Sequence, residues 1–312
     1  MSNWGKGHEN NSIGWGQGGI NNTINWANAY DRSNSGQTVL NPDLTPNPFE
    51  DATVAFSLRD LGLGAEHVVR VRRSTDNVEQ DFTANEITDG TLTSFCGVGN
   101  GFVSVWYNQT GGANAIQPTA SRQPRIVNTG FLETKLGKPA IYMTIGINLF
   151  INDPTKLLGG DGIRSFVVFS VDNVPTSNKG IFGKWGGTVN EFAFLSSNFI
   201  SPAGLVVISR NDSNVQTNTA SGTELSIGTY LLEADFNNNF QKIFLNSNEI
   251  ASQTITSVQN SDANFSLGSY EASTVNLTTE NSYYQDFIIF QAQNTGLKEE
   301  IRENINSYYA IY

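Results

Sequence analysis

The sequence predicts an all-β fold, a β-sandwich, from three observations. From Asp51 to Gly296 the apolar residues recur with a period of two nearly everywhere, as in strands that bury one face. Turn-forming Gly, Asn, Asp and Ser separate these segments at roughly regular spacing, as a sandwich requires. Only after Gly296 does the apolar period become that of a helix.

The stretch around which the rest is organised predicts two strand pairs. In the first pair Val69 and Val71 alternate with polar residues, and residues 74–77 have turn chemistry. The second pair opens with the glycine-rich turn 97–101, and the aromatic and β-branched run 102–107 suits a buried strand. Two such pairs cannot bury their apolar faces alone, so we expect a second sheet against them.

The remaining strands follow in order along the chain. A hairpin is predicted over residues 241–251, turning at 246–248. Segment 54–58 is too short to decide between a helix and a strand. Further strands are predicted at residues 138–143, 165–171, 180–185, 191–195, 205–209, 229–236, 264–267 and 284–290.

The chain ends in one predicted amphipathic helix. Leu297, Ile301, Ile305 and Tyr308 fall at i, i+4, i+8 and i+11, with charged residues on the other faces. Capping is expected from the polar pair 294–295. We expect this helix to lie on the sandwich.

Residues 1–30 contain an eleven-residue repeat that places three of the five tryptophans in register. Its glycines exclude a stable helix. The segment is either a disordered Gly/Asn tail or an anchoring arm that docks on a partner. The residues expected to make the partner contact are Trp4, Ile13, Trp15, Ile24, Trp26 and Tyr30. Residues 31–50 carry three prolines and are predicted to be a linker, which leaves 51–312 for the sandwich.

Composition excludes several classes of function. Lys and Arg number 18 against 29 Asp and Glu, a net charge of −11, so nucleic acid and anionic membrane are poor partners. The one basic cluster, Arg70, Arg72 and Arg73, is interpreted as a solvated strand face. The polar N-terminus resembles no ordinary secretory signal, and no run of 18 apolar residues exists to insert into a membrane. We therefore expect the protein to be made in a cytoplasm and to stay soluble or enter an assembly.

Cysteine and histidine usage argues against a metal or redox centre. Cys96 is the single cysteine and is expected to be a buried small hydrophobe. His8 and His67 are the two histidines, and they lie far apart in the sequence. No metal site and no cofactor is predicted.

Two resemblances sharpen this interpretation. The hairpin FQKIFLNSNEIAS, the strand YYQDFIIF and the closing helix resemble the second half of a laminin-G-like or concanavalin-like jelly roll. The blocks HVVRVRRSTDNVEQDF and SFCGVGNGFVSVWYNQTGGANAIQPT resemble the start of the arabinofuranosidase B catalytic domain, with its "RSSD" and "YDQSG" signatures. The fold implied is a concanavalin-like jelly-roll β-sandwich with an extended N-terminal arm and one C-terminal α-helix.

The family's activity depends on two carboxylates about 5 Å apart, a nucleophile and a general acid. By resemblance to its strand M-E-A-I-Y-F, Glu191 stands at the nucleophile's place. The acid's segment L-G-x-G-G-D is matched by Leu267–Glu271, where the carboxylate comes one position early and the glycines are gone. The paired cysteines of the family's sugar pocket are also missing. We therefore expect no catalytic residues and no enzyme.

Shorter relatives of the opening block recur in structural proteins of tailed bacteriophages, often after an arm with a WG-x-G-x-x-NN-x-I repeat. This resemblance implies a virion component, a fibre or decoration module anchored by its arm to capsid, portal or tail proteins. It also implies a homo-oligomer, trimers being frequent, and contact with a host surface glycan. The alternatives are a carbohydrate-active enzyme or binding module of the arabinofuranosidase family, and a bacterial surface adhesin, which the absent signal sequence argues against.

Overall fold

The structure of the chain is a computed structural model, and it falls into two compact units, Met1–Asn47 and Pro48–Tyr312. In the first unit, β1 (Asp31–Arg32) and β2 (Thr38–Val39) pair as antiparallel strands inside the predicted linker. The six residues predicted to contact a partner, from Trp4 to Tyr30, lie outside the described residues. The described residues are 31–32, 38–39, 46–152, 162–174, 178–186, 191–197, 200–237, 239–255, 263–270, 281–291 and 296–312.

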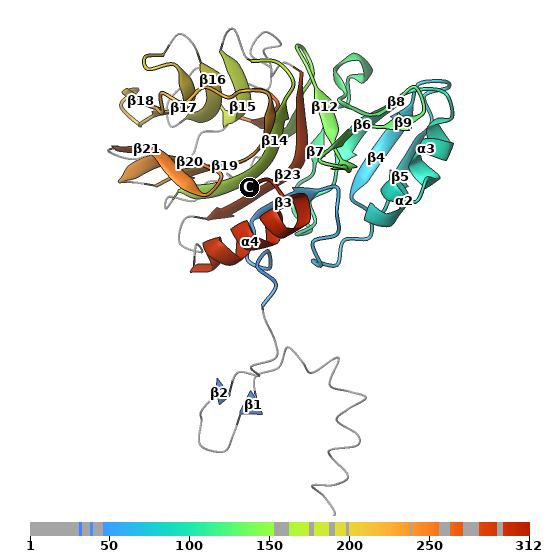
Figure 1. Cartoon of the computed structure of the whole chain (residues 1–312), viewed down its shortest axis with the longest axis horizontal. Coiled ribbons are helices and arrows are strands. Elements are labelled where there is room, and N and C mark those ends of the chain that lie inside the picture. The colour runs from blue at the N-terminus through green and yellow to red at the C-terminus, as the bar shows by residue number, and fades with distance from the viewer. Residues whose placement is uncertain are drawn as a thin grey trace, which may run out of the picture. The chain divides into compact units, whose positions relative to one another are not determined.

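The second unit is built mainly from antiparallel strands, which confirms the predicted all-β sandwich (Figure 1). Its strands are β3 (Val54–Ser57), β4 (Val69–Arg73), β5 (Glu79–Phe82), β6 (Gly101–Trp106), β7 (Ala115–Ile116), β8 (Arg125–Asn128), β9 (Phe131–Leu132), β10 (Thr134–Lys135), β11 (Lys138–Pro139), β12 (Ile141–Met143), β13 (Leu149–Ile151), β14 (Ile163–Val171), β15 (Lys179–Lys184), β16 (Phe192–Ser197), β17 (Gly204–Arg210), β18 (Gln216–Ala220), β19 (Gly228–Phe236), β20 (Phe240–Leu245), β21 (Asn248–Thr254), β22 (Phe265–Leu267) and β23 (Ser282–Gln291).

These strands form two facing layers joined at one side. The first layer runs β21-β20-β19-β14-β23, and β3 and β12 both pair along the far edge of β23. The second runs β13-β22-β15-β16-β17-β18. The chain of pairs β12-β8-β6-β7-β13 connects the layers. Segment 54–58, which the sequence left open, therefore contains a strand.

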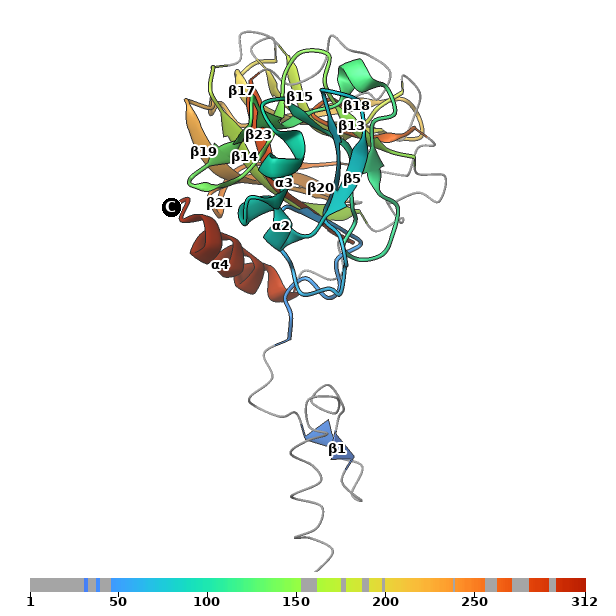
Figure 2. The same cartoon turned by 90° about the vertical axis from the view of Figure 1, so that its right-hand side faces the viewer.

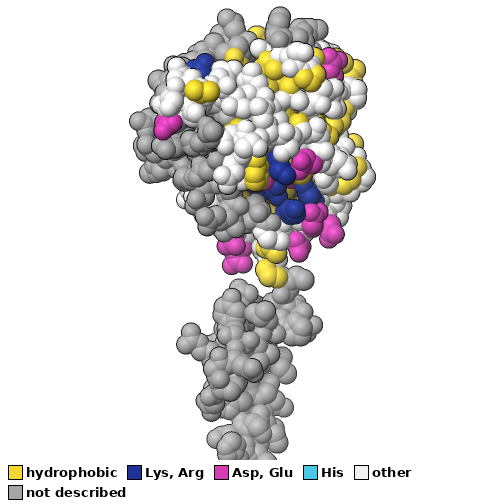
Figure 3. Space-filling view, turned by 90° about the vertical axis from the view of Figure 1, so that its left-hand side faces the viewer, with side chains coloured by type: hydrophobic (Ala, Val, Ile, Leu, Met, Phe, Trp, Pro, Cys, Tyr) yellow, Lys and Arg dark blue, Asp and Glu magenta, His cyan; other side chains and the backbone are white. Residues whose placement is uncertain are grey.

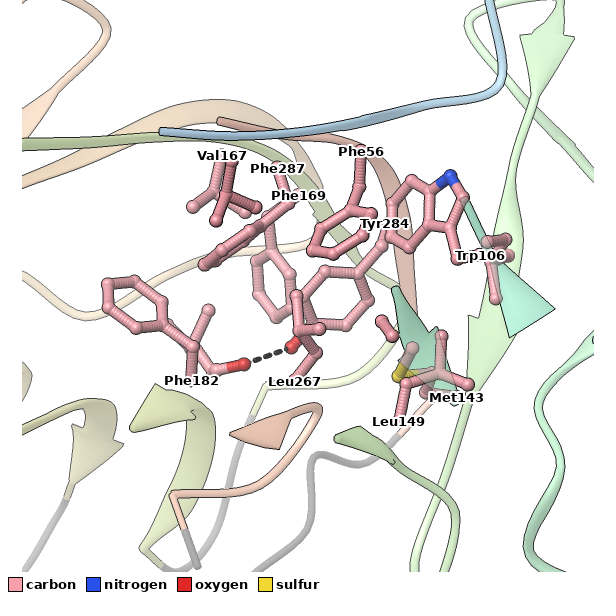
Figure 4. Close-up of a cluster of buried hydrophobic side chains, with 14 of the residues drawn as sticks. Phe56, Trp106, Met143, Leu149, Val167, Phe169, Phe182, Leu267, Tyr284 and Phe287 are labelled. Carbon is pink, nitrogen blue, oxygen red and sulfur yellow. Dashed lines mark hydrogen bonds between the residues drawn. The ribbon is translucent and has the colours of Figure 1, made fainter. Parts of the chain in front are cut away.

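The core between the layers is largely aromatic (Figure 4). Phe182 of β15 meets Phe287 of β23 at a centroid distance of 5.2 Å, almost perpendicular, and stacks on Phe265 at 5.9 Å. The Tyr284 hydroxyl donates across the core to the carbonyl of Ile181 at 2.7 Å, so its polar tip is satisfied although the ring is fully buried. Each such ring contributes about 1.5–3 kcal/mol by burial.

A smaller lobe holds β4, β5 and β6 with two short helices, α2 (Ala84–Thr88) and α3 (Thr91–Cys96) (Figure 1). Figure 2 shows the two helices beside β5. The sequence analysis passed over both helices. Thr83 and Glu86 form a capping box that begins α2. Cys96 is buried as predicted, and a Cβ on Gly101 would lie 2.7 Å from its Sγ, so only glycine fits opposite it.

The predicted C-terminal helix is α4 (Lys298–Tyr309), and it covers the outer surface of the first layer. Ile301 and Ile305 are buried against Phe166 and Ile288, as the helical period predicts. Tyr309 is the fully packed tyrosine, whereas its neighbour at 308 is only partly buried. No helix among the residues described is long and apolar enough to cross a membrane.

Buried charges are paired beneath and beside α4. Arg302 makes a two-pronged ion pair with Glu233, at 2.9 Å to each carboxylate oxygen. Arg164 pairs with Asp235 at 2.5 Å, and both guanidinium groups lie 5.2 Å from the ring centre of Phe244. Figure 3 shows acidic and basic side chains intermixed on this side of the molecule. The Arg302–Glu233 pair fixes α4 to the sheet beyond its apolar contacts.

Candidate functional site

The candidate site lies on the outer surface of the second layer, where the start of β16 lies beside the end of β17. Glu191 and Arg210 are directly opposite in the ladder, since the Glu191 amide donates to the Arg210 carbonyl at 3.2 Å and the Arg210 amide to the Glu191 carbonyl at 2.8 Å. Such a pair places both side chains on the same face. That face continues as a small apolar cluster that includes Ala193 and Ile208.

Glu191 is a fully buried carboxylate. Its Oε1 accepts a hydrogen bond from the Gly186 amide at 2.6 Å. Its Oε2 lies 3.6 Å from Nη1 of Arg210, an ion pair longer than a hydrogen bond. Burial of a carboxylate is costly unless charges and donors compensate it, and the Gly186 amide and the Arg210 guanidinium supply part of that compensation.

Two aromatic rings stand beside the charged pair. The Arg210 guanidinium lies 4.3 Å from the ring centre of Trp185. Trp185 in turn meets Tyr270 edge to face, at 6.3 Å and 89°. A Cβ on Gly183 would lie 2.8 Å from the Cβ and carbonyl oxygen of Tyr270, so glycine on β15 is what lets Tyr270 lie against the strand. The result is an aromatic wall beside Glu191.

This combination has recognisable chemistry. A carboxylate in such a place can act as a nucleophile or a proton donor. Aromatic rings beside a few oriented polar groups are typical of small-molecule sites. Glu271, the second carboxylate that the resemblance indicated, lies outside the described residues.

Sequence reasoning found only part of this site. Glu191 came from the resemblance, but Arg210 was missed because the register that pairs it with Glu191 is not visible in the sequence. Trp185 was seen only as the end of a strand, and Tyr270 as a departure from a glycine motif. No group of three His, Cys, Asp or Glu residues suited to a metal ion occurs within the described part of the chain.

Comparison with known proteins shows which solved structures share the fold. No protein-family model matches the sequence, and no curated protein does. Solved structures do match: an arabinofuranosidase complexed with arabinofuranosyl-α-1,2-xylobiose has a TM-score of 0.62 at 12% identity, covering 83% of this chain and 64% of that one. A GH54 α-L-arabinofuranosidase soaked with a cyclic sulfate inhibitor has a TM-score of 0.59 at 12% identity, covering 83% and 65%.

A more distant match is a Trypanosoma rangeli sialidase in complex with 2,3-difluorosialic acid, with a TM-score of 0.42 at 10% identity, covering 64% of this chain and 31% of that one. The chain spans just under two thirds of the length of each arabinofuranosidase. At such identity the likeness shows the fold alone.

One prediction is overturned by these matches. The sequence analysis expected no enzyme because the acid's motif and the paired cysteines are altered. Two solved structures that share the fold at TM-scores above 0.5 are glycosidases, so that prediction is wrong. That prediction rested on altered motif residues, and the structure shows that the fold is kept and that Glu191 is buried.

Proposed function

We propose that this chain is a carbohydrate-active β-sandwich carried on a tailed-bacteriophage particle, with Glu191 as the carboxylate that acts on the sugar. The observation that carries the proposal is the burial of Glu191 beside Arg210 and the ring of Trp185. A sugar site needs an aromatic surface and a few fixed polar groups, and both are present there.

The substrate class follows from the fold relatives. One of the two arabinofuranosidases is complexed with arabinofuranosyl-α-1,2-xylobiose, so an arabinofuranoside is the first substrate to test. In a retaining reaction Glu191 attacks the anomeric carbon while an acid protonates the departing oxygen, and water then releases the sugar from Glu191. Glu271 is the acid that the sequence resemblance offers.

The test is release of 4-nitrophenol from 4-nitrophenyl α-L-arabinofuranoside. We expect release by the unaltered chain and background release by Glu191→Gln, because the amide cannot form the glycosyl ester. Glu249→Gln is the matched control, since Glu249 is an exposed glutamate paired with Lys242 at 2.8 Å on the surface. Equal release by the unaltered chain and Glu191→Gln would refute the assignment, as would neither release nor binding of the arabinofuranoside.

The virion setting rests on the N-terminal repeat. Residues 1–30 carry few aliphatic groups, and fixing their backbone against a partner costs about 1–2 kcal/mol per residue. Burial of Trp4, Trp15 and Trp26 against capsid, portal or tail proteins would return part of that cost. The sandwich is then displayed outward, as a homo-oligomer, toward a host glycan.

Deletion of residues 1–40 tests this anchoring role. Pro48–Tyr312 is a compact unit by itself, so the truncated chain is expected to stay folded. It should no longer co-purify with particles. Incorporation at the level of the full chain would show that the anchor lies on the sandwich instead.

A further inference from the structure

A pocket of about 430 Å³ lies between the β3–β4 connection and the β6–β7 connection. Figures 1 and 2 both place the β3–β4 connection at the opposite end of the unit from β17, which carries Arg210. The pocket is therefore distinct from the Glu191 site. Its polar lining includes His67, Tyr107, Asn108, Thr110 and Asn114.

Two side-chain amides in the pocket are held in fixed orientations. Oδ1 of Asn108 accepts hydrogen bonds from the amides of Ala55 at 2.9 Å and Thr110 at 3.2 Å. Oδ1 of Asn114 accepts from the Asn108 amide at 2.9 Å. Because backbone donors identify the oxygen in each case, the remaining group must be the NH2.

Neither NH2 group is used by the protein. Asn108 is only 5% exposed, yet its Nδ2 donates to no protein atom among the residues described, and the same holds for Nδ2 of Asn114. Nδ2 of Asn108 is not among the fully buried unpaired atoms, and Asn114 is half-buried, so a ligand or water can accept from both groups. The pocket therefore presents two preoriented donors.

Gly112 keeps one of these donors accessible. A Cβ at this position would lie 2.8 Å from Nδ2 of Asn108 and 3.5 Å from Oγ1 of Thr110. Gly112 is not among the glycines with positive φ, so its backbone conformation does not itself require glycine. Glycine is needed there because a side chain would fill the space in front of the Asn108 amide.

The lining of the pocket offers little to an anion. None of the described residues that line it is Lys or Arg, and Glu66 is one of them. The Tyr107 hydroxyl donates to Asp81 at 2.6 Å, which holds the ring in place, and the charge of Asp81 is paired with Arg70 at 2.7 Å. A ligand that accepts from two amides, contacts a tyrosine ring and carries no negative charge has the chemistry of a neutral sugar.

We infer that this pocket binds a neutral sugar residue through Nδ2 of Asn108 and Nδ2 of Asn114, with the Tyr107 ring as its apolar surface. The chain then carries two sugar sites at opposite ends of the sandwich. The second needs no catalytic carboxylate, so it serves attachment rather than hydrolysis.

The test measures binding of neutral methyl glycosides to the full chain by saturation-transfer NMR and titration calorimetry. The panel is methyl arabinofuranoside, xylopyranoside, glucopyranoside, galactopyranoside and mannopyranoside, with glucuronate as the anionic comparison. Asn114→Asp keeps the oxygen that Asn108 needs but replaces the donor, so affinity should fall about tenfold or more. Gly112→Ala should do the same by crowding Nδ2 of Asn108.

Two controls separate this site from the proposed catalytic one. Gly296→Ala is the matched glycine control, since a Cβ there meets nothing within 4 Å. Glu191→Gln should keep the pocket's affinity. Binding that survives Asn114→Asp and Gly112→Ala, or is lost in Glu191→Gln alone, overturns the inference, as does failure of every neutral glycoside to bind. If Gly112→Ala does not fold, Asn114→Asp decides alone.

Discussion

The two outer surfaces of the sandwich both bury a carboxylate, but they treat it differently. Under α4, Asp286 accepts short hydrogen bonds from Ser57 at 2.6 Å, Tyr309 at 2.7 Å and two guanidinium nitrogens of Arg59 at 3.1 and 3.2 Å. On the other surface, Glu191 has the Gly186 amide at 2.6 Å and the Arg210 guanidinium at 3.6 Å. Both carboxylates are fully buried.

The difference separates a structural charge from a reactive one. At Asp286 every donor comes from an element that must dock for the fold to close: β3, its following turn, and α4. Arg59 also lies 4.6 Å from the ring centre of Tyr308, which ties the same guanidinium to the helix. Gly186 and Arg210, which contact Glu191, lie just after β15 and at the end of β17, the two neighbours of β16, beside aromatic rings. We expect the first surface to govern stability and the second to govern function.

The largest effect should come from Asp286→Asn. The amide cannot accept from both Arg59 and Tyr309, and the guanidinium of Arg59, whose side chain is 11% exposed, loses its counter-charge, so unfolding free energy should fall by about 3–5 kcal/mol. Urea unfolding at neutral pH measures this. Glu249→Gln, at an exposed surface pair, should change little. If Asp286→Asn lowers the unfolding free energy by less than about 1 kcal/mol, the surface under α4 does not govern stability.

The next largest effect should come from alkaline pH, which should lower the unfolding free energy through Tyr309 of α4. Burial raises the pKa of Tyr309 well above its usual value, and the nearby charge of Asp286 acts in the same direction. The folded chain thus keeps the phenol protonated where the unfolded chain ionises. This contribution is complete below the unfolded pKa of about 10 and is lost above it, by up to about 1.4 kcal/mol per pH unit. Tyr309→Phe should flatten the pH dependence of unfolding above that value; an unchanged slope would contradict this account.

The fold could be anticipated because its signals are local. Period-two runs placed the strands, and the period of Ile301 and Ile305 placed α4. The short helices α2 and α3 were missed, although Thr83 and Glu86 carry a readable capping box. Five- and six-residue helices have too few turns to show an apolar period.

The sites could be anticipated only in part because they depend on pairing. Glu191 was found by resemblance, but its partner Arg210 is brought opposite it by the register of two strands. The sugar pocket was missed because Asn108 and Asn114 look like ordinary turn residues in the sequence. Their amide orientations exist only once Ala55 lies beside them.

A smaller effect on stability should distinguish Arg302 from Arg210. Arg302→Lys replaces a two-pronged contact to Glu233 by a single ammonium, and the loss should be about 1–2 kcal/mol. Arg210→Lys should cost less, because Arg210 has no hydrogen bond to Glu191 at 3.6 Å. Matched urea unfolding of the two variants measures the difference. Equal losses would mean that the Glu191 surface is also held by its ion pair.

The smallest effect on stability, and the largest on function, should come from Glu191→Gln. The amide oxygen can keep the hydrogen bond from Gly186, and removal of a buried charge offsets the lost attraction to Arg210, so the unfolding free energy should change by less than about 1 kcal/mol. Arabinofuranoside release should meanwhile fall to background. If Glu191→Gln destabilises the chain as much as Asp286→Asn, Glu191 is a structural carboxylate. The sandwich would then owe any activity to another residue.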